Sequence, residues 1–300
     1  MNLVVGATGL LGGEVCRRLA ANQKPVRALV RPLADASRLD DLRKAGAEMV
    51  RGDLKDPASL EAACAGAGVV FSTASSTFSR QTGDSIDSVD RVGQLSLVAA
   101  AKSAGVKHFV FVSFSPMAED FALQRAKREV EQAVIASGMT YTILRPTFFM
   151  EIWLSPAVGF DVAGRHARLY GSGENPISWI SFANVADFAV RSPESAAARN
   201  AILPLGGPEA LSPIEVVRIF EELTGAPFAV EYMLESVLRA GKAAARRALD
   251  EALASLSLGY AQGDVIDMRA TLKAMPVRLA SVREYAKWLL SEGRAEGTEA

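Results

Sequence analysis

The stretch VVGATGLLGG (residues 4–13) carries the most informative pattern in this chain. Gly6, Gly9 and Gly12 stand in G-x-x-G-x-x-G spacing, directly after the β-branched run 2–6 and before apolar residues at helical spacing. A bound pyrophosphate needs a turn without a Cβ, close backbone approach, and amides at a helix N-terminus. The pattern predicts a dinucleotide-binding loop. Its expected contacts are Gly6, Thr8, Gly9, Leu10, Leu11 and Gly12.

Short apolar runs alternate with helical patterns over the first half of the chain. We predict six strands, at 2–6, 25–31, 47–53, 68–75, 107–114 and 139–146. Strands separated by helices form right-handed βαβ units, so the sheet should be parallel and covered on both faces. The fold class is therefore α/β, with a doubly wound parallel sheet.

The rhythm changes after Pro146. The patterns there predict strands at 177–181, 201–207 and 227–233, helices at 182–191, 212–225 and 281–293, and one helix or a helix pair over 234–258. We expect a nucleotide-binding domain at 1–150, to which 176–206 returns. A smaller C-terminal α+β substrate domain would comprise 151–175 and 207–292, followed by a flexible tail at 293–300.

Composition excludes several classes of function. The chain of 300 residues has 33 basic and 34 acidic side chains, so it lacks the positive charge typical of nucleic-acid and anionic-membrane binding. Two cysteines cannot form a disulfide framework, and His108 and His166 are too few for a three-histidine zinc site, so no metal is expected. Apolar runs such as 95–101 are too short to span a membrane, and the start resembles no signal peptide. We expect a cytoplasmic protein.

Arg31 ends the second predicted strand, where the adenosine ribose is expected. A carboxylate at this position would bind the 2′-hydroxyl of NAD. A guanidinium instead suits a 2′-phosphate through charge-assisted hydrogen bonds. The sequence therefore favours NADP(H), and Asp35 nearby keeps NAD(H) as an alternative.

Several stretches together resemble one protein family. They are GATGLLGGEV (6–15), VRALVR (26–31), GDLKDPASL (52–60), DRVGQLSLVAAAKSAGVKHFVFVS (90–113), TILRPTFFME (142–151) and GGPEALSPIEVVRIFEELTG (206–225). The chain is similar to the NmrA-like group of atypical short-chain dehydrogenases/reductases. This resemblance implies a Rossmann domain, a smaller C-terminal substrate domain and NADP(H) binding. The group is similar in fold to isoflavone, phenylpropanoid, quinone and dye reductases, and to catalytically silent redox-sensing regulators.

The resemblance also implies cofactor contacts at the strand ends. Asp53 and Leu54 would contact the adenine; the alternative for Asp53 is a helix or turn cap. The remaining expected contacts are Thr73, Ala74, Ser75, Ser113, Phe114, Pro146, Thr147 and Phe148. Ligands of such sheets lie beyond the carboxyl ends of the strands, which agrees with these positions.

Lys127 lies where the superfamily's Tyr-x-x-x-Lys motif has its lysine, but Leu123 stands in the tyrosine position and Phe114 in that of the usual Ser or Thr. Leucine cannot transfer a proton, so ordinary carbonyl–alcohol interconversion is disfavoured. Lys127 is the candidate catalytic residue and ribose ligand; the alternative is a surface lysine.

An apolar group is expected over the nicotinamide, where it would bind a small hydrophobic substrate. Its members are Phe114, Phe148, Phe149, Met150 and Trp153, with Tyr170 as a candidate remote acid; Phe148 and Trp153 are favoured because they follow the strand end directly. The alternatives are a core between the domains and, for Tyr170, packing.

Two functions follow from the missing tyrosine. The first is an NADPH-dependent oxidoreductase that reduces a small hydrophobic, conjugated substrate such as a quinone, an enone or a related electrophile by hydride transfer. The second is a catalytically silent NADP(H)-binding redox sensor of NmrA type. A homodimer and a regulatory protein partner both stay open.

Overall fold

The central sheet of the computed structural model, which describes residues 1–77 and 81–296, has seven strands in those residues. Their order is β3-β2-β1-β4-β5-β6-β9, and every neighbouring pair is parallel. The strands are β1 (Asn2–Val5), β2 (Val26–Val30), β3 (Glu48–Arg51), β4 (Val69–Ser72), β5 (His108–Val112), β6 (Thr140–Pro146) and β9 (Ala201–Leu205). The order reverses between β1 and β4, the position where such sheets bind dinucleotides.

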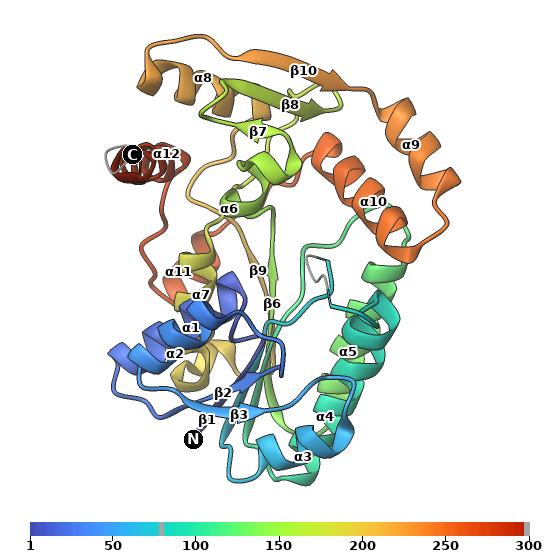
Figure 1. Ribbon diagram of the computed structural model, residues 1–300, viewed down its shortest axis with the longest axis vertical. Coiled ribbons are helices and arrows are strands. Elements are labelled where there is room, and N and C mark those ends of the chain that lie inside the picture. The colour runs from blue at the N-terminus through green and yellow to red at the C-terminus, as the bar shows by residue number, and fades with distance from the viewer. Residues whose placement is uncertain (78–80, 297–300) are drawn as a thin grey trace.

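Helices cover both faces of this sheet (Figure 1). One face carries α1 (Leu10–Ala21), α2 (Ala36–Lys44) and α7 (Phe182–Arg191); the other carries α3 (Pro57–Cys64), α4 (Gln94–Ser103) and α5 (Ala122–Ala136). Side chains alternate along β1: Val4 enters the first core, and Leu3 and Val5 enter the second. The fold is the expected doubly wound Rossmann architecture.

A second, smaller sheet lies at the end of the molecule toward which β6 and β9 run (Figure 1). In it β8 (His166–Tyr170) pairs in parallel with β10 (Ala229–Met233) and antiparallel with β7 (Phe160–Asp161). The helices α6 (Met150–Trp153), α8 (Pro213–Thr224) and α12 (Val282–Glu296) belong to the same region. This α+β region has its own apolar core, which contains Phe160, Trp179 and Phe220.

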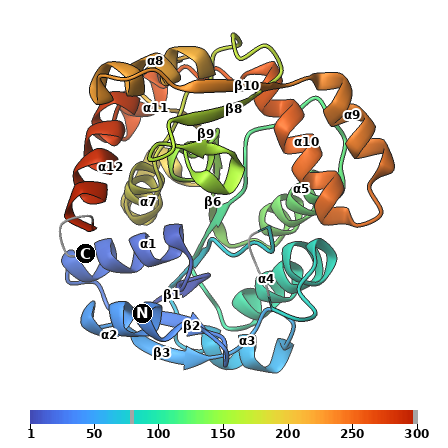
Figure 2. The same ribbon diagram turned by 45° about the horizontal axis from the view of Figure 1, so that its top comes forward.

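Two helices form a hairpin beside α5, as Figure 2 shows. They are α9 (Glu235–Ala244) and α10 (Ala248–Gln262). Glu119, in the loop between β5 and α5, accepts hydrogen bonds from Arg239 at 2.8 Å and from Lys242 at 2.6 Å. The hairpin is thereby tied to the carboxyl end of the sheet. The remaining helices are α11 (Arg269–Ala274) and the short turns η2 (Pro156–Val158), η3 (Ser192–Glu194) and η4 (Ala196–Ala198).

The structure differs from the sequence-based expectation at four places. The stretch 86–105 has the apolar spacing of one long α-helix, but it begins as a π-helix, η1 (Ile86–Gly93), before α4. The strand expected at 177–181 is instead a set of isolated bridges, because Ile177 and Ile180 pair with different segments. Strand β8 was not expected. Helix α12 continues to Glu296, and the rest of the expected tail lies outside the described residues.

Within the described ranges, no helix combines the length and the apolar character needed to cross a membrane.

Candidate functional site

The glycine loop joins β1 to α1 at the point where the strand order reverses. Gly6 has φ +90°, a conformation that favours glycine. A Cβ on Gly12 would lie 2.1 Å from the carbonyl oxygen of Gly6, and one on Gly6 would lie 2.6 Å from Oγ1 of Thr73. The first turn of α1 therefore packs against the strand end so closely that only hydrogen atoms fit there.

The first amides of α1 are free of intrahelical bonds by helix geometry. The first bond of the helix ladder runs from Gly13 to the carbonyl of Gly9, at 2.9 Å. The amides of Leu10, Leu11 and Gly12 precede it. Leu10 is 49% exposed, whereas the side chain of Leu11 packs in the core, so only the backbone of Leu11 remains as a candidate ligand. Half-buried Thr8 lies in the loop.

Arg31 directly follows β2 and forms an ion pair with a carboxylate of the protein. Its Nη1 lies 2.6 Å from Oδ2 of Asp84, a carboxylate whose side chain is 3% exposed. Lys55 forms ion pairs with both Asp84 and Asp53. Two cations and two carboxylates thus meet beyond the ends of β2 and β3. Asp53 also accepts from the amide of Lys55 at 2.9 Å, the turn-capping role considered as its alternative.

Hydrogen bonds tie the loop after β4 to the end of β1 and to α4. The hydroxyl of Thr73 donates to the carbonyl of Val5 at 3.2 Å, and Ser75 and Thr77 share a hydrogen bond of 3.1 Å. The carbonyl of Ala74 accepts from Gln94 at 3.0 Å. Leu54 is buried beside Gly93 of η1, where a Cβ on the glycine would lie 2.7 Å from Cβ of Leu54.

Lys127 is buried rather than on the surface. Its side chain is 6% exposed, and Nζ lies 3.4 Å from Oδ1 of Asp90, whose side chain is 0% exposed. The same ammonium donates to the carbonyl of Ala74 at 3.5 Å. Oδ2 of Asp90 accepts from the amide and the hydroxyl of Ser76, at 2.9 and 2.6 Å. The pair therefore links α5 and the π-helix η1 to the loop after β4. π-Helical turns often occur at functional sites.

Ser113 and Phe114 end β5 beside a second ion cluster. Arg128 donates to the hydroxyl of Ser113 at 3.1 Å and to the carbonyl of Phe114 at 2.7 Å. Arg128 and Arg145 both pair with Glu131, which is 0% exposed. Burial alone would raise the pKa of Glu131, but hydrogen bonds and the charges of the two arginines lower it. Ser113 is therefore held by Arg128.

Leu123, in the expected tyrosine position, packs in an apolar cluster. It is 3% exposed and lies with Ile86, Phe121, Ala126 and Ala252, the last from α10. No proton-transferring group replaces the phenol within that cluster.

The segment after β6 separates two neighbouring phenylalanines. The amide of Thr147 donates to Leu205 at 2.9 Å, and its hydroxyl donates to the carbonyl of Ser178 at 2.6 Å. The carbonyl of Pro146 accepts from the amide of Ser115 at 2.9 Å. Phe148 lies in the core of the smaller region, whereas Phe149 packs on Phe182 at a centroid distance of 4.4 Å. Successive side chains of an extended chain point to opposite sides, which explains the division.

The expected pocket residues do not form one wall. Phe149 belongs to the core under α7, and Phe114 lies with Phe121, at a centroid distance of 6.0 Å. Met150 is fully buried, and Trp153 stacks on Tyr260 at 5.1 Å. Tyr170 is 9% exposed, donates to the carbonyl of Val158 at 2.9 Å, and has a pKa raised by burial. The alternative considered for this group, core packing, describes their contacts.

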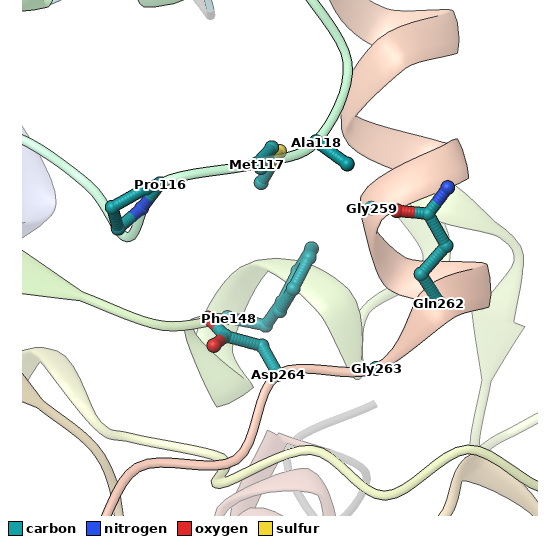
Figure 3. A pocket seen from close by; sticks show the side chains of 8 residues that line it. All are labelled: Pro116, Met117, Ala118, Phe148, Gly259, Gln262, Gly263 and Asp264. Carbon is teal, nitrogen blue, oxygen red and sulfur yellow. The ribbon is translucent and has the colours of Figure 1, made fainter.

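A cavity of about 70 Å³ lies beyond the carboxyl ends of β5 and β6 (Figure 3). Its lining residues are Pro116, Met117, Ala118, Phe148, Gly259, Gln262, Gly263 and Asp264. Of the expected site residues, only Phe148 contributes to it. Sequence reasoning missed Asp264 because no motif marks it; it reaches β6 only through long-range pairing with Ile177.

Among the described residues, no metal-binding cluster is found, and no histidine lines the cavity beyond β5 and β6. Residues 1–77 and 81–296 contain no cluster of three or more His, Cys, Asp or Glu arranged to hold a metal ion. His108 begins β5, at the opposite end of the strand, and burial lowers its pKa to about 4.

Comparisons with known proteins agree with the fold. The model of the NmrA-like family matches residues 2–286. The chain is 34% identical over 256 residues to the NAD(P)H azoreductase of Xenophilus azovorans, covering 85% of this chain and 84% of that one. It is 32% identical over 249 residues to the photosystem II assembly factor Ycf39 of Synechocystis, covering 79% and 72%. The quinone oxidoreductase QOR2 of Escherichia coli, solved with NADPH, has a similar fold: the TM-score is 0.76 and the identity 24%, covering 97% of this chain and 100% of that one.

Proposed function

Because this chain belongs to the NmrA-like family, we propose that it is an NADP(H)-dependent reductase of a small hydrophobic, conjugated electrophile such as a quinone or an enone. The observation that carries the cofactor assignment is the glycine cradle, in which a Cβ on Gly12 would lie 2.1 Å from the carbonyl of Gly6. Such close packing brings the first amides of α1 to the strand end, where a pyrophosphate binds.

Arg31 supports NADP(H) as the preferred cofactor. Its guanidinium offers further donors to a 2′-phosphate beside the one that it gives to Asp84. The carboxylate of Asp84, in turn, offsets part of the positive charge that Arg31 would offer to a 2′-phosphate. The two residues together favour a protein that prefers NADP(H) and also accepts NAD(H). The similar azoreductase carries the same dual cofactor in its name.

Lys127 fits a positioning role in cofactor binding better than a role in proton transfer. Its ammonium is held between Asp90 and the carbonyl of Ala74. Neither the lysine nor its partners line the cavity beyond β5 and β6. Lys127 would fix the loop after β4, against which the ribose is expected to bind.

The cavity beyond β5 and β6 supports a substrate with a flat apolar body. The nicotinamide would supply the hydride in that region, since ligands of these sheets lie beyond the carboxyl strand ends. Phe148 and Met117 form apolar parts of its lining. A volume of about 70 Å³ is below the roughly 300 Å³ of ordinary ligand pockets, so the cavity must widen for a substrate. Met117 is the flexible element: it packs where a Cβ on Gly259 would lie 2.7 Å from its sulfur.

The experiment that tests this proposal offers NADPH and NADH to the protein with a panel of quinones, enones and azo dyes. We expect oxidation of NADPH with at least one electrophile, at a higher kcat/KM than with NADH. Failure to bind either nucleotide would overturn the cofactor assignment, and binding without turnover would overturn the reductase.

A catalytically silent NADP(H)-binding protein is the second candidate. The small volume of the cavity favours it, as does the similarity to the assembly factor Ycf39. In that case the nucleotide itself would be the redox signal. Burial raises the pKa of Cys16 to about 12 and that of Cys64 to about 11, so neither thiol is suited to redox sensing.

A further inference from the structure

Asp264 lies in a segment whose backbone is fixed on both sides. Its amide donates to the carbonyl of Pro176 at 3.0 Å, and its carbonyl accepts from the amide of Ser178 at 2.9 Å. Gly263 has φ +80°, and a Cβ there would lie 2.6 Å from the carbonyl oxygen of Pro176. The position of Asp264 beside the end of β6 is therefore set by main-chain contacts and not by its own side chain.

Asp264 is one of the residues that line the cavity, and its carboxyl group is drawn beside Phe148 in Figure 3. The loop after β5, the segment after β6 and the end of α10 supply the other lining residues. Asp264 is the one member of this lining set with a titratable side chain; Gln262 is its other polar side chain. A substrate placed over the ends of β5 and β6 would therefore meet this carboxyl group.

The surroundings of the carboxyl group favour its protonated form. Burial raises the pKa of Asp264, and the neighbouring hydroxyl of Ser115 offsets part of the shift by hydrogen bonding. Ser115 is 5% exposed and is fixed by the bond from its amide to Pro146. Within the described chain, no Lys, Arg, His or second carboxyl group contributes to this pKa, and no ion pair involves Asp264. A carboxyl group held in this way can donate a proton at a pH where exposed aspartates are ionised.

We propose that Asp264 is the proton donor of the reductase, in the role that a phenol fills in relatives with tyrosine at the position of Leu123. The proposal rests on the function proposed above. When an enone is reduced, a C–H bond at C4 of the nicotinamide of NADPH would break. The β-carbon of the enone would gain this hydrogen together with both electrons of the bond. The π electrons of the C=C bond shift, and the carbonyl oxygen becomes an oxyanion. The O–H bond of Asp264 then breaks, its proton bonds to that oxygen, and the carboxylate recovers a proton from water.

Two Asp264 variants and one matched control test the proposal. Asp264→Asn should lower kcat/KM about 100-fold or more, the usual contribution of a general acid, and should leave the Kd for NADP+ unchanged. The decline of wild-type kcat/KM at high pH should disappear in this variant. Asp264→Glu should recover part of the rate. Asp267→Asn alters an exposed neighbour paired with Arg269 and should retain wild-type activity.

Carboxyl NMR gives a readout that does not need turnover. In protein labelled with ¹³C at the aspartate carboxyl carbons, one resonance should titrate above the ordinary value of about 3.9 and be missing from Asp264→Asn. Ser115→Ala removes the offsetting hydroxyl, so both this titration and the basic limb of the rate profile should move to higher pH. This second variant keeps the test valid where Asp264→Asn does not fold.

The two failures are distinguishable. Wild-type rates and an unchanged pH profile in Asp264→Asn would overturn the role of Asp264 and leave the reductase intact. A resonance that titrates in the ordinary aspartate range would overturn it as well. Absence of turnover by the wild-type protein with every electrophile would overturn both proposals.

Discussion

The guanidinium of Arg31 lies 2.6 Å from the carboxylate of Asp84, so the cation expected to select the cofactor is already paired with an anion of the protein. Asp84 is separated from Arg31 by 53 positions in the chain and also pairs with Lys55. A 2′-phosphate would compete with this carboxylate for the same positive charge. The strength of the preference for NADP(H) therefore depends on Asp84 as much as on Arg31.

Replacing Asp84 with asparagine should strengthen the binding of NADP+. Loss of the carboxylate removes both the competition for Arg31 and the repulsion of a 2′-phosphate. We expect the Kd for NADP+ to fall about 10-fold, about 1.4 kcal/mol, and the Kd for NAD+ to change less. Calorimetric titration with both nucleotides measures the two constants.

Two further variants serve as a test of the opposite effect and as a control. Arg31→Ala should have the opposite effect and weaken NADP+ much more than NAD+. Asp87→Asn removes an exposed carboxylate paired with Arg91 and should alter neither constant. An unchanged ratio of the two constants in both Asp84→Asn and Arg31→Ala would contradict the assignment of this cluster to the 2′-phosphate.

Gly12→Ala should destabilise the protein and prevent nucleotide binding. The added methyl group would lie 2.1 Å from the carbonyl oxygen of Gly6, so α1 must move away from β1. We expect a loss of about 1–3 kcal/mol in unfolding free energy, as for other overpacked sites. The matched control is Gly13→Ala, one residue further, where the nearest atom is 3.4 Å away. Since alanine favours helix over glycine, the control should be as stable as wild type or more so. Equal unfolding free energies and equal nucleotide affinities for the two variants would contradict the close packing of Gly12 against Gly6.

Lys127→Met should destabilise the fold because it leaves the buried carboxylate of Asp90 without its cation. Removing one partner of a buried pair costs roughly 3–5 kcal/mol. Adding Asp90→Asn to the same chain should recover part of this loss, because the amide oxygen still accepts from Ser76. Urea unfolding of the single and double variants measures the coupling. If the double variant loses as much as the two single losses combined, the two residues are not coupled.

Glu151 should make stability depend on pH. Burial raises its pKa to about 7; Oε1 accepts from the amide of Phe182 at 2.9 Å, and Oε2 is buried without a hydrogen-bond partner among the described residues. An unfolded glutamate titrates near about 4.3, so the folded state binds the proton more tightly. The contribution of Glu151 to stability is therefore greatest below about pH 4 and falls as the pH rises to about 7.

Melting temperatures from pH 4 to 8 measure this contribution (on the order of a few kcal/mol). In Glu151→Gln the decline should be smaller than in wild type. Glu222→Gln, at an exposed position paired with Arg283, serves as the control and should follow the wild-type curve. Parallel curves for wild type and Glu151→Gln would show that the pKa of Glu151 is the same in the folded and unfolded protein, and would contradict this prediction.

The sequence predicted the parts of the fold that rest on local pattern. The glycine loop, the six strands of the first half and the strand predicted at 201–207, observed as β9, each have the hydrophobic spacing or turn residues that mark them. The π-helix was not predicted, because Ile86–Gly93 has apolar spacing that an α-helix shares. Strand β8 was missed because HARLY is half polar and its longer pairing is with β10, more than sixty positions away.

The candidate site was predictable at the strand ends and not between them. Motifs mark Gly6 and Arg31, but nothing near Asp84 or Asp264 in the sequence indicates their partners. Phe148 and Phe149 are adjacent residues of the same type, so the sequence does not distinguish them. The direction of the chain after β6 decides that Phe148 reaches the cavity and that Phe149 packs on Phe182. Contacts between distant segments, which carry no local signal, set these positions.

The transfer of deuterium from NADPH labelled at C4 of the nicotinamide to carbon of an enone tests the central claim most directly. Both C4 epimers of the labelled cofactor are needed, since either face of the ring is a candidate. With wild-type protein, mass spectrometry of the product should show deuterium from one epimer only, and Gly12→Ala should give none. Tight binding of NADPH with no label in any enone product and no oxidation of the cofactor by any electrophile of the panel would contradict the reductase.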